Sequence, residues 1–167
     1  MTLMTVLALA AAAQAQHAHG HGQHAGHDMG KAHAMQCAAI PANAADTLFN
    51  QFNAAWATKN PDEVTKLFAK DAVLLATVSN EPRTTPAGVR DYFVSFLKGS
   101  PVGTINTSTV VPGCNQMARM GTWTVSLQNA QGARSDVKAR YTFIYKMEDG
   151  QWKIAHLHSS MMPEKTN

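Results

Sequence analysis

One stretch constrains the fold of this chain more than any other: residues 139–163, with the sequence ARYTFIYKMEDGQWKIAHLHSSMMP. In its first half, Tyr141, Phe143 and Tyr145 alternate with polar or aliphatic residues, a period of two that indicates a half-buried β-strand. The second half alternates in the same way, and Glu148-Asp149-Gly150 supplies turn residues between the halves. The stretch therefore predicts a β-hairpin.

The length of the turn decides which side chains share a face of the hairpin. A three-residue loop over Glu148–Gly150 leaves His156 and His158 on the face opposite the aromatic side chains. A two-residue turn at Asp149-Gly150 shifts the register by one residue and moves both histidines to the aromatic face. We favour the three-residue loop, because Asp-Gly at its end suits a type I turn followed by a left-handed glycine.

Two runs of sequence resemble a known family. DGQWKIAHLHSS resembles the last strand of calcium/calmodulin-dependent protein kinase II association domains and of their bacterial stand-alone relatives of the SgcJ/EcaC and SnoaL-like types. FNAAWATKNPDEVTKLFAKDAVLL resembles the two-helix opening of the same group. The resemblance covers residues 44–163 and implies the NTF2-like fold, an α+β cone in which a curved antiparallel sheet wraps around N-terminal helices. It also implies a homo-oligomer, either a dimer or a larger ring.

The remaining patterns suit that fold. Residues 44–58 have the apolar spacing of a helix, Asn60-Pro61 caps and starts a second one, and Thr85-Pro86 opens a third. Strands are expected over residues 73–78, 105–111, 117–127, 137–147 and 152–159. Helices followed by an antiparallel meander indicate an α+β domain.

The first 36 residues differ in character from the rest. Residues 1–15 hold an apolar run that ends in Ala13-Gln14-Ala15, the small-x-small pattern of a signal-peptidase site, and the run is too short to span a bilayer. The Lys or Arg expected before the run is absent, which a translation start further upstream would explain. An N-terminal core helix is the alternative to a signal peptide. We expect an exported protein, periplasmic or secreted, with a signal peptide (1–15), a leader (16–36), a folded domain (37–163) and a tail (164–167).

The leader is rich in histidine and lacks large apolar residues other than methionine, so it is expected to be disordered. Imidazoles at this density bind Cu(II), Ni(II) or Zn(II). A solvated leader without a physiological metal is the alternative, because no fixed ligand spacing selects a geometry. The candidate metal ligands are His17, His19, His21, His24, His27 and His33.

Cys37 and Cys114 are the only cysteines. In an oxidising compartment, an even pair far apart in the sequence indicates one disulfide. Two reduced, buried thiols are the alternative.

The interior of the expected cone is aromatic and apolar, with no carboxylate at an inward strand position, which argues against proton-transfer catalysis. We expect it to bind a small apolar or aromatic ligand without catalysis. A SnoaL-like isomerase or hydrolase, or an oxidoreductase, acting on a small hydrophobic molecule is one alternative, and a metal-handling protein is another. The candidate lining is Trp56, Tyr92, Trp123, Tyr141, Phe143, Leu157 and Ser159.

Arg140, His156 and His158 are expected together on the outer face of the sheet, at a subunit interface. The two histidines are also candidate zinc or copper ligands, although a third ligand is not evident. The net charge of +3, without a basic stripe, does not indicate a nucleic-acid partner.

Overall fold

The computed structural model describes residues 36, 37 and 39–163. The expectations for the signal peptide, for the leader up to residue 35 and for the tail lie outside these residues. The described elements follow in the order α1 (Ala44–Ala57), α2 (Pro61–Thr65), β1 (Phe68–Leu75), α3 (Pro86–Phe96), a 3-10 turn η1 (Leu97–Gly99), β2 (Val102–Gly113), β3 (Gln116–Gln128), β4 (Arg134–Glu148) and β5 (Gln151–Met161). Among these helices, none combines the length and apolar character needed to cross a bilayer.

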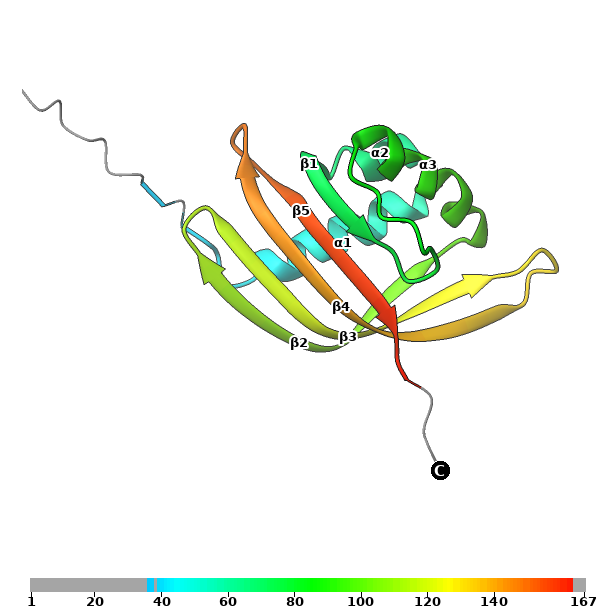
Figure 1. Cartoon of the computed structure of the whole chain (residues 1–167). Helices are drawn as coiled ribbons and strands as arrows, with labels where there is room; N and C mark the ends of the chain where they lie inside the picture. Colours follow the sequence, from blue (N-terminus) through cyan, green and yellow to red (C-terminus); the bar gives the residue numbers. More distant parts are fainter. Residues whose placement is uncertain (1–35, 38, 164–167) are drawn as a thin grey trace, which may run out of the picture. The chain divides into compact units, whose positions relative to one another are not determined.

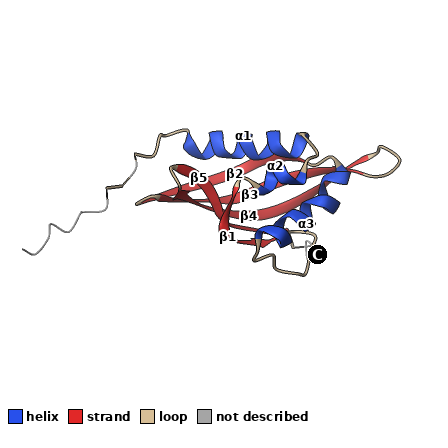
Figure 2. Ribbon diagram, turned by 90° about the horizontal axis from the view of Figure 1, so that it is seen from above, coloured by secondary structure: helices blue, strands red, loops and turns tan. Residues whose placement is uncertain are grey.

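The five strands form one curved sheet that does not close, in the order β1-β5-β4-β3-β2 (Figure 1). The pairs β5–β4, β4–β3 and β3–β2 are antiparallel, and β1 pairs with β5 in parallel. Helix α1 passes behind the strands in Figure 1 and runs along one side of the sheet in Figure 2. The predicted α+β architecture, with a curved sheet against helices, is therefore confirmed.

The helices begin at the predicted residues. The Asn60 side chain accepts a hydrogen bond from the Asp62 N–H at 2.9 Å, and Pro61 takes the first position of α2. Thr85 Oγ1 accepts from the Gly88 N–H at 3.1 Å at the start of α3. In both cases a polar side chain satisfies a backbone donor that the first helical turn leaves unpaired.

The turn of the β4–β5 hairpin differs from the favoured prediction: it has two residues, not three. Glu148 pairs directly with Gln151, and the residues between them, Asp149 and Gly150, have φ values of 52° and 75°. Positive φ at both central positions matches the twist of the flanking strands in a type I′ turn. The favoured three-residue loop is wrong because Asp149 itself adopts the left-handed conformation.

A β-bulge in β5 then offsets the consequence of the shorter turn. Tyr145 pairs with Ile154 and Ile144 pairs with His156, so Ala155 has no partner of its own on β4. The extra residue shifts the register by one again. The residues of β5 beyond the bulge therefore face the side that a three-residue loop would have given them. The histidines therefore lie on the face opposite the aromatic side chains, as predicted.

An aromatic core joins α1 to the inner face of the sheet. Phe143 of β4 is fully buried, and its ring centroid lies 5.4 Å from that of Phe52, 6.3 Å from that of Phe49 and 5.9 Å from that of Trp123. The rings meet edge to face, a favourable arrangement for aromatic quadrupoles. Burying side chains of this size supplies much of the stability of such a domain.

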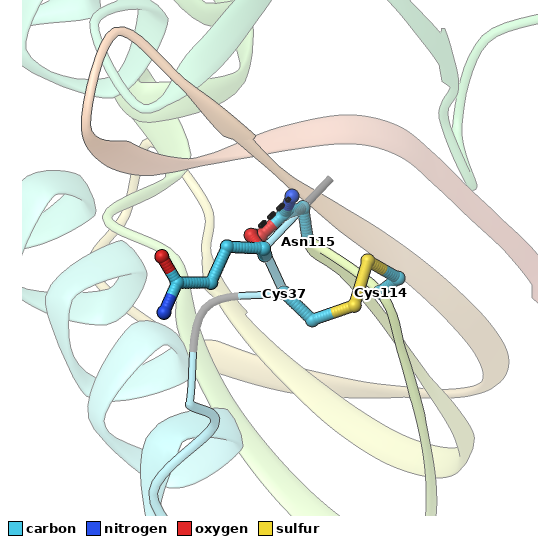
Figure 3. Close-up of a disulfide and its surroundings, with 4 residues drawn as sticks. Cys37, Cys114 and Asn115 are labelled. Carbon is cyan, nitrogen blue, oxygen red and sulfur yellow. Dashed lines mark hydrogen bonds between the residues drawn. A yellow bond between two sulfur atoms is a disulfide. The ribbon is translucent and has the colours of Figure 1, made fainter. Parts of the chain in front are cut away.

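The predicted disulfide between Cys37 and Cys114 is present, with an S–S distance of 2.05 Å (Figure 3). It ties the segment before α1 to the turn between β2 and β3. Asn115 Nδ2 donates to the Gln36 carbonyl oxygen at 3.5 Å beside it. The start of the domain is thus held at one end of the sheet.

Candidate functional site

A small apolar cavity lies inside the curved sheet, between the strands and helices α1 and α3. It leaves about 20 Å³ for the centre of a water molecule, so it is almost filled by its own walls. Five predicted lining residues surround it: Trp56, Tyr92, Trp123, Leu157 and Ser159. The rest of the lining was not predicted from the sequence. It consists of Leu74, Ala76, Thr77, Val78, Phe93, Phe96, Val125, Leu127 and Val137.

The structure places the other two predicted lining residues, Tyr141 and Phe143, in the core beside this cavity. The Tyr141 hydroxyl donates to the backbone oxygen of Thr107 at 3.1 Å. The Phe143 ring stacks on Tyr145 at a centroid distance of 5.5 Å. Both side chains support the wall of the cavity from within the core.

Few polar groups reach the cavity, and one of them has an unused donor. Ser159 Oγ accepts from Trp123 Nε1 at 3.1 Å and is also in contact with the Thr77 hydroxyl. Trp56 is 2 % exposed, and its Nε1–H has no hydrogen-bond partner among the described residues. Buried donors are nearly always paired, so the unpaired N–H of this wall residue is an exception among the described residues.

Among the described residues, none that lines the cavity carries a charge at neutral pH. Tyr92 is the one titratable group in that lining, and burial raises its pKa further above the usual tyrosine range, an effect that the nearby Arg83 opposes only in part. A group that titrates so far from neutrality does not serve as a general acid or base near pH 7.

A wider, more polar groove runs along α3 beside the cavity. The groove shares Val78, Tyr92 and Phe96 with the cavity and leaves about 320 Å³ for the centres of water molecules. Arg83 and Asp91 form an ion pair in it, with 3.3 Å between Nη1 and Oδ2. Any ligand entering the cavity from this side has to displace the apolar side chains that the groove and the cavity share.

The outer face of the sheet carries the second group of predicted residues. Arg140 is exposed and pairs across the sheet with Thr122 and Ser160. His158 is exposed and lies opposite Thr142, while His156 is half-buried. The prediction that the arginine and the two histidines share this face is confirmed by the strand register. Within the described part of the chain, no three His, Cys, Asp or Glu side chains gather closely enough to hold a metal ion.

Arg119 is a buried cation that sequence reasoning missed. It is 3 % exposed, and its guanidinium donates to the Ala45 carbonyl oxygen at 2.9 Å and to Asp46 Oδ1 at 2.7 Å. Its Nε donates to Ser108 Oγ at 2.9 Å, and the guanidinium lies over the Phe49 ring. These contacts hold the start of α1 on the sheet. The sequence contained a sign of its burial. Residues 119, 123 and 125 are separated by even numbers of positions in one strand, so their side chains lie on the same, inward face.

A model of a known protein family matches most of the chain. The family model of the calcium/calmodulin dependent protein kinase II association domain matches residues 43–163. No protein among those with curated descriptions matches the chain.

A solved structure from Xanthomonas campestris, provisionally described as a domain of the same family, is 44% identical. It has a TM-score of 0.72, and the match covers 77% of this chain and 96% of that one. A structure from Novosphingobium aromaticivorans, provisionally described as an aromatic ring hydroxylase, is 20% identical over 75% of this chain and 94% of that one, with a TM-score of 0.65. A second from that organism, provisionally described as a scytalone dehydratase, is 11% identical over 72% and 83%, with a TM-score of 0.64.

The last two likenesses show the fold alone. The family model, by contrast, spans all the helices and strands from α1 to β5. The Xanthomonas structure is 44% identical over 77% of the chain. The chain belongs to the calcium/calmodulin-dependent protein kinase II association domain family.

Proposed function

We propose that this chain is an exported, self-associating domain that assembles through the outer face of its sheet and holds a small neutral ligand in its cavity without catalysis. Domains of this family are oligomerisation domains, and membership supports a homo-oligomer. The disulfide supports export, because such bonds persist mainly in oxidising compartments.

The observation that carries the proposal is the character of the outer face. Its cross-strand rows combine short polar and aliphatic side chains, and Arg140 is the one charged residue in the three rows named next. These rows are Val111–Ala118–Ile144–His156, Thr109–Met120–Thr142–His158 and Thr107–Thr122–Arg140–Ser160. Charged residues flank these three rows on the same face, with Asp136 and Lys138 on one side and Lys146 and Lys153 on the other. A central patch with little charge and partly exposed aliphatic groups, surrounded by charge, is typical of surfaces that another subunit covers.

Two substitutions test the association. Replacing His156 and His158 by Asp puts two like charges on each copy of this face, so we expect the oligomer to dissociate while the monomer keeps its thermal transition. The matched control is Ala130→Asp with Gln131→Asp, which adds the same charge at exposed positions of the β3–β4 turn.

Light scattering gives the mass and thermal melts report the fold. A double Asp variant with the mass of the unchanged protein would contradict assembly through this face.

A Phe143→Ala variant, by contrast, should lose ~3–5 kcal/mol of unfolding free energy, as expected for a cavity in the core.

The cavity walls suggest the ligand's chemistry. An uncharged, largely apolar lining that includes Trp56, whose indole N–H has no partner among the described residues, suits a neutral apolar or aromatic molecule with a hydrogen-bond acceptor. The cavity has room for little more than one water, so a larger molecule binds only when the apolar side chains at its wall move aside. We expect acetophenone to bind in this way at least tenfold more tightly than benzoate, measured by tryptophan fluorescence, and Trp56→Phe to remove most of that preference. Equal affinity for the ketone and the carboxylate would contradict this ligand class.

A further inference from the structure

Two histidines on the outer face of β5 are placed as a pair of metal ligands. His156 and His158 are two residues apart, so their side chains leave the same face of the strand, and their ring centroids are 6.5 Å apart. Two imidazoles on one tetrahedral zinc, with Zn–N distances of about 2.0–2.1 Å, have their centroids about 5 Å apart. Side-chain rotations that bring the rings about 1 Å closer therefore suffice to chelate one ion.

A backbone carbonyl fixes His156 in the tautomer that metal binding through Nε2 requires. His156 Nδ1 lies 3.1 Å from the Val73 carbonyl oxygen, which can only accept, so Nδ1 carries the proton and Nε2 carries the lone pair. Metal-binding histidines usually donate their second N–H to a carbonyl or carboxylate in this way, which fixes the ring. Among the described residues, no partner occupies His156 Nε2 or the exposed ring of His158.

The residues that pair directly with the two histidines neither repel a cation nor complete its coordination, while Arg140 and Lys146 lie one row further away on either side. The residues paired with the two histidines are Thr142 and Ile144 on β4 and Val73 and Leu75 on β1. None of these carries a charge. One chain thus offers two neutral nitrogen ligands, and a structural zinc site needs four.

We propose that His156 and His158 from two copies of this chain bind one Zn²⁺ ion across the subunit interface. The inference rests on the association through the outer face proposed above. A two-fold interface brings the same patch of both subunits together, so a bidentate pair near the axis meets its own copy. Four imidazoles then supply a closed tetrahedral site, which zinc accepts without a geometric preference of its own.

The test uses the full chain with its six leader histidines replaced by Gln, so that zinc on the leader does not obscure the result. After dialysis against a weak chelator, we expect about 0.5 zinc per chain, as one ion per pair of subunits requires. His156→Gln or His158→Gln should abolish retention. Lys98→Gln, exposed on η1 and away from this face, should leave it unchanged. Co(II) in place of zinc should give the intense visible absorption of tetrahedral cobalt.

Light scattering distinguishes failure of the zinc site from failure of the proposed association through the outer face. EDTA should raise the dimer dissociation constant at least tenfold, and zinc should restore it. A dimer that retains no zinc and ignores EDTA would overturn the metal site while association stands. A monomer without zinc under all conditions would overturn both. Zinc bound by the unmodified chain but lost when the leader histidines are replaced would overturn the symmetric site and make the leader the source of ligands.

Discussion

The Asn53 side chain of α1 forms two hydrogen bonds with the backbone of Gly103 on β2. Asn53 Nδ2 donates to the Gly103 oxygen at 2.7 Å, and the Gly103 N–H donates to Asn53 Oδ1 at 2.9 Å. Because β2 is an edge strand, a helix side chain here takes the place of a neighbouring strand. A Cβ at residue 103 would lie 3.1 Å from the Phe49 ring, so the close approach favours glycine.

Replacing Asn53 by Asp should lower the free energy of unfolding by ~1–3 kcal/mol, because a carboxylate cannot donate to the Gly103 oxygen and repels it. Chemical denaturation measures the change. The control is Asn106→Asp, which keeps the Oδ1 acceptor that the exposed Thr124 hydroxyl uses. Equal stability of the two variants would show that the paired hydrogen bonds contribute nothing.

Gly121 should tolerate no side chain. A Cβ there would lie 2.1 Å from the Thr107 backbone oxygen, beside the bulge at which β2 and β3 shift register. Backbone cannot move aside as a flexible side chain can, so Gly121→Ala should cost about 3 kcal/mol or more. Gly113→Ala, with its nearest neighbour at an ordinary 3.4 Å, should stay within ~0.5 kcal/mol in the same melts. A stable Gly121→Ala variant would contradict the close strand approach.

Two buried tyrosines should respond in opposite directions to loss of their hydroxyls. The Tyr145 hydroxyl is buried without a partner among the described residues, so Tyr145→Phe should raise the free energy of unfolding by ~1 kcal/mol. The Tyr141 hydroxyl donates to Thr107, so Tyr141→Phe should lower it by a similar ~1 kcal/mol. Urea denaturation of both variants checks the signs, and a loss at Tyr145 would show that its hydroxyl is satisfied.

Opening the disulfide should destabilise the domain. Cys37 and Cys114 are 77 residues apart, and closing a loop of that length restricts the unfolded chain by ~4 kcal/mol. Denaturation with and without reductant gives the difference, and intact mass should rise by two hydrogens on reduction. The Cys37→Ser, Cys114→Ser variant should match the reduced protein and ignore reductant. Free thiols that alkylate without reduction would contradict the bond.

Much of the local structure could be predicted from residues close together in the chain. Capping by Asn60 and Thr85 depends on neighbours two or three residues away, and the helix and strand periods depend on alternation within each element. The pairing of the two cysteines followed from their number and from the expected compartment. Arg119 was missed because its partners, Asp46 and the Ala45 carbonyl, lie on a helix more than 70 residues earlier.

The hairpin shows what only the tertiary structure decided. Its two strands could be predicted from alternation, but the turn and the bulge at Ala155 could not, and these two together decide which face the histidines take. β5 pairs with β4 on one side and β1 on the other, and both pairings shift register between Ile154 and His156. A local pattern of apolar and polar residues determines which side chains share a face. The placement of an extra residue depends on hydrogen bonds to two strands at once, one of which lies some 80 residues earlier, so only the assembled sheet could settle it.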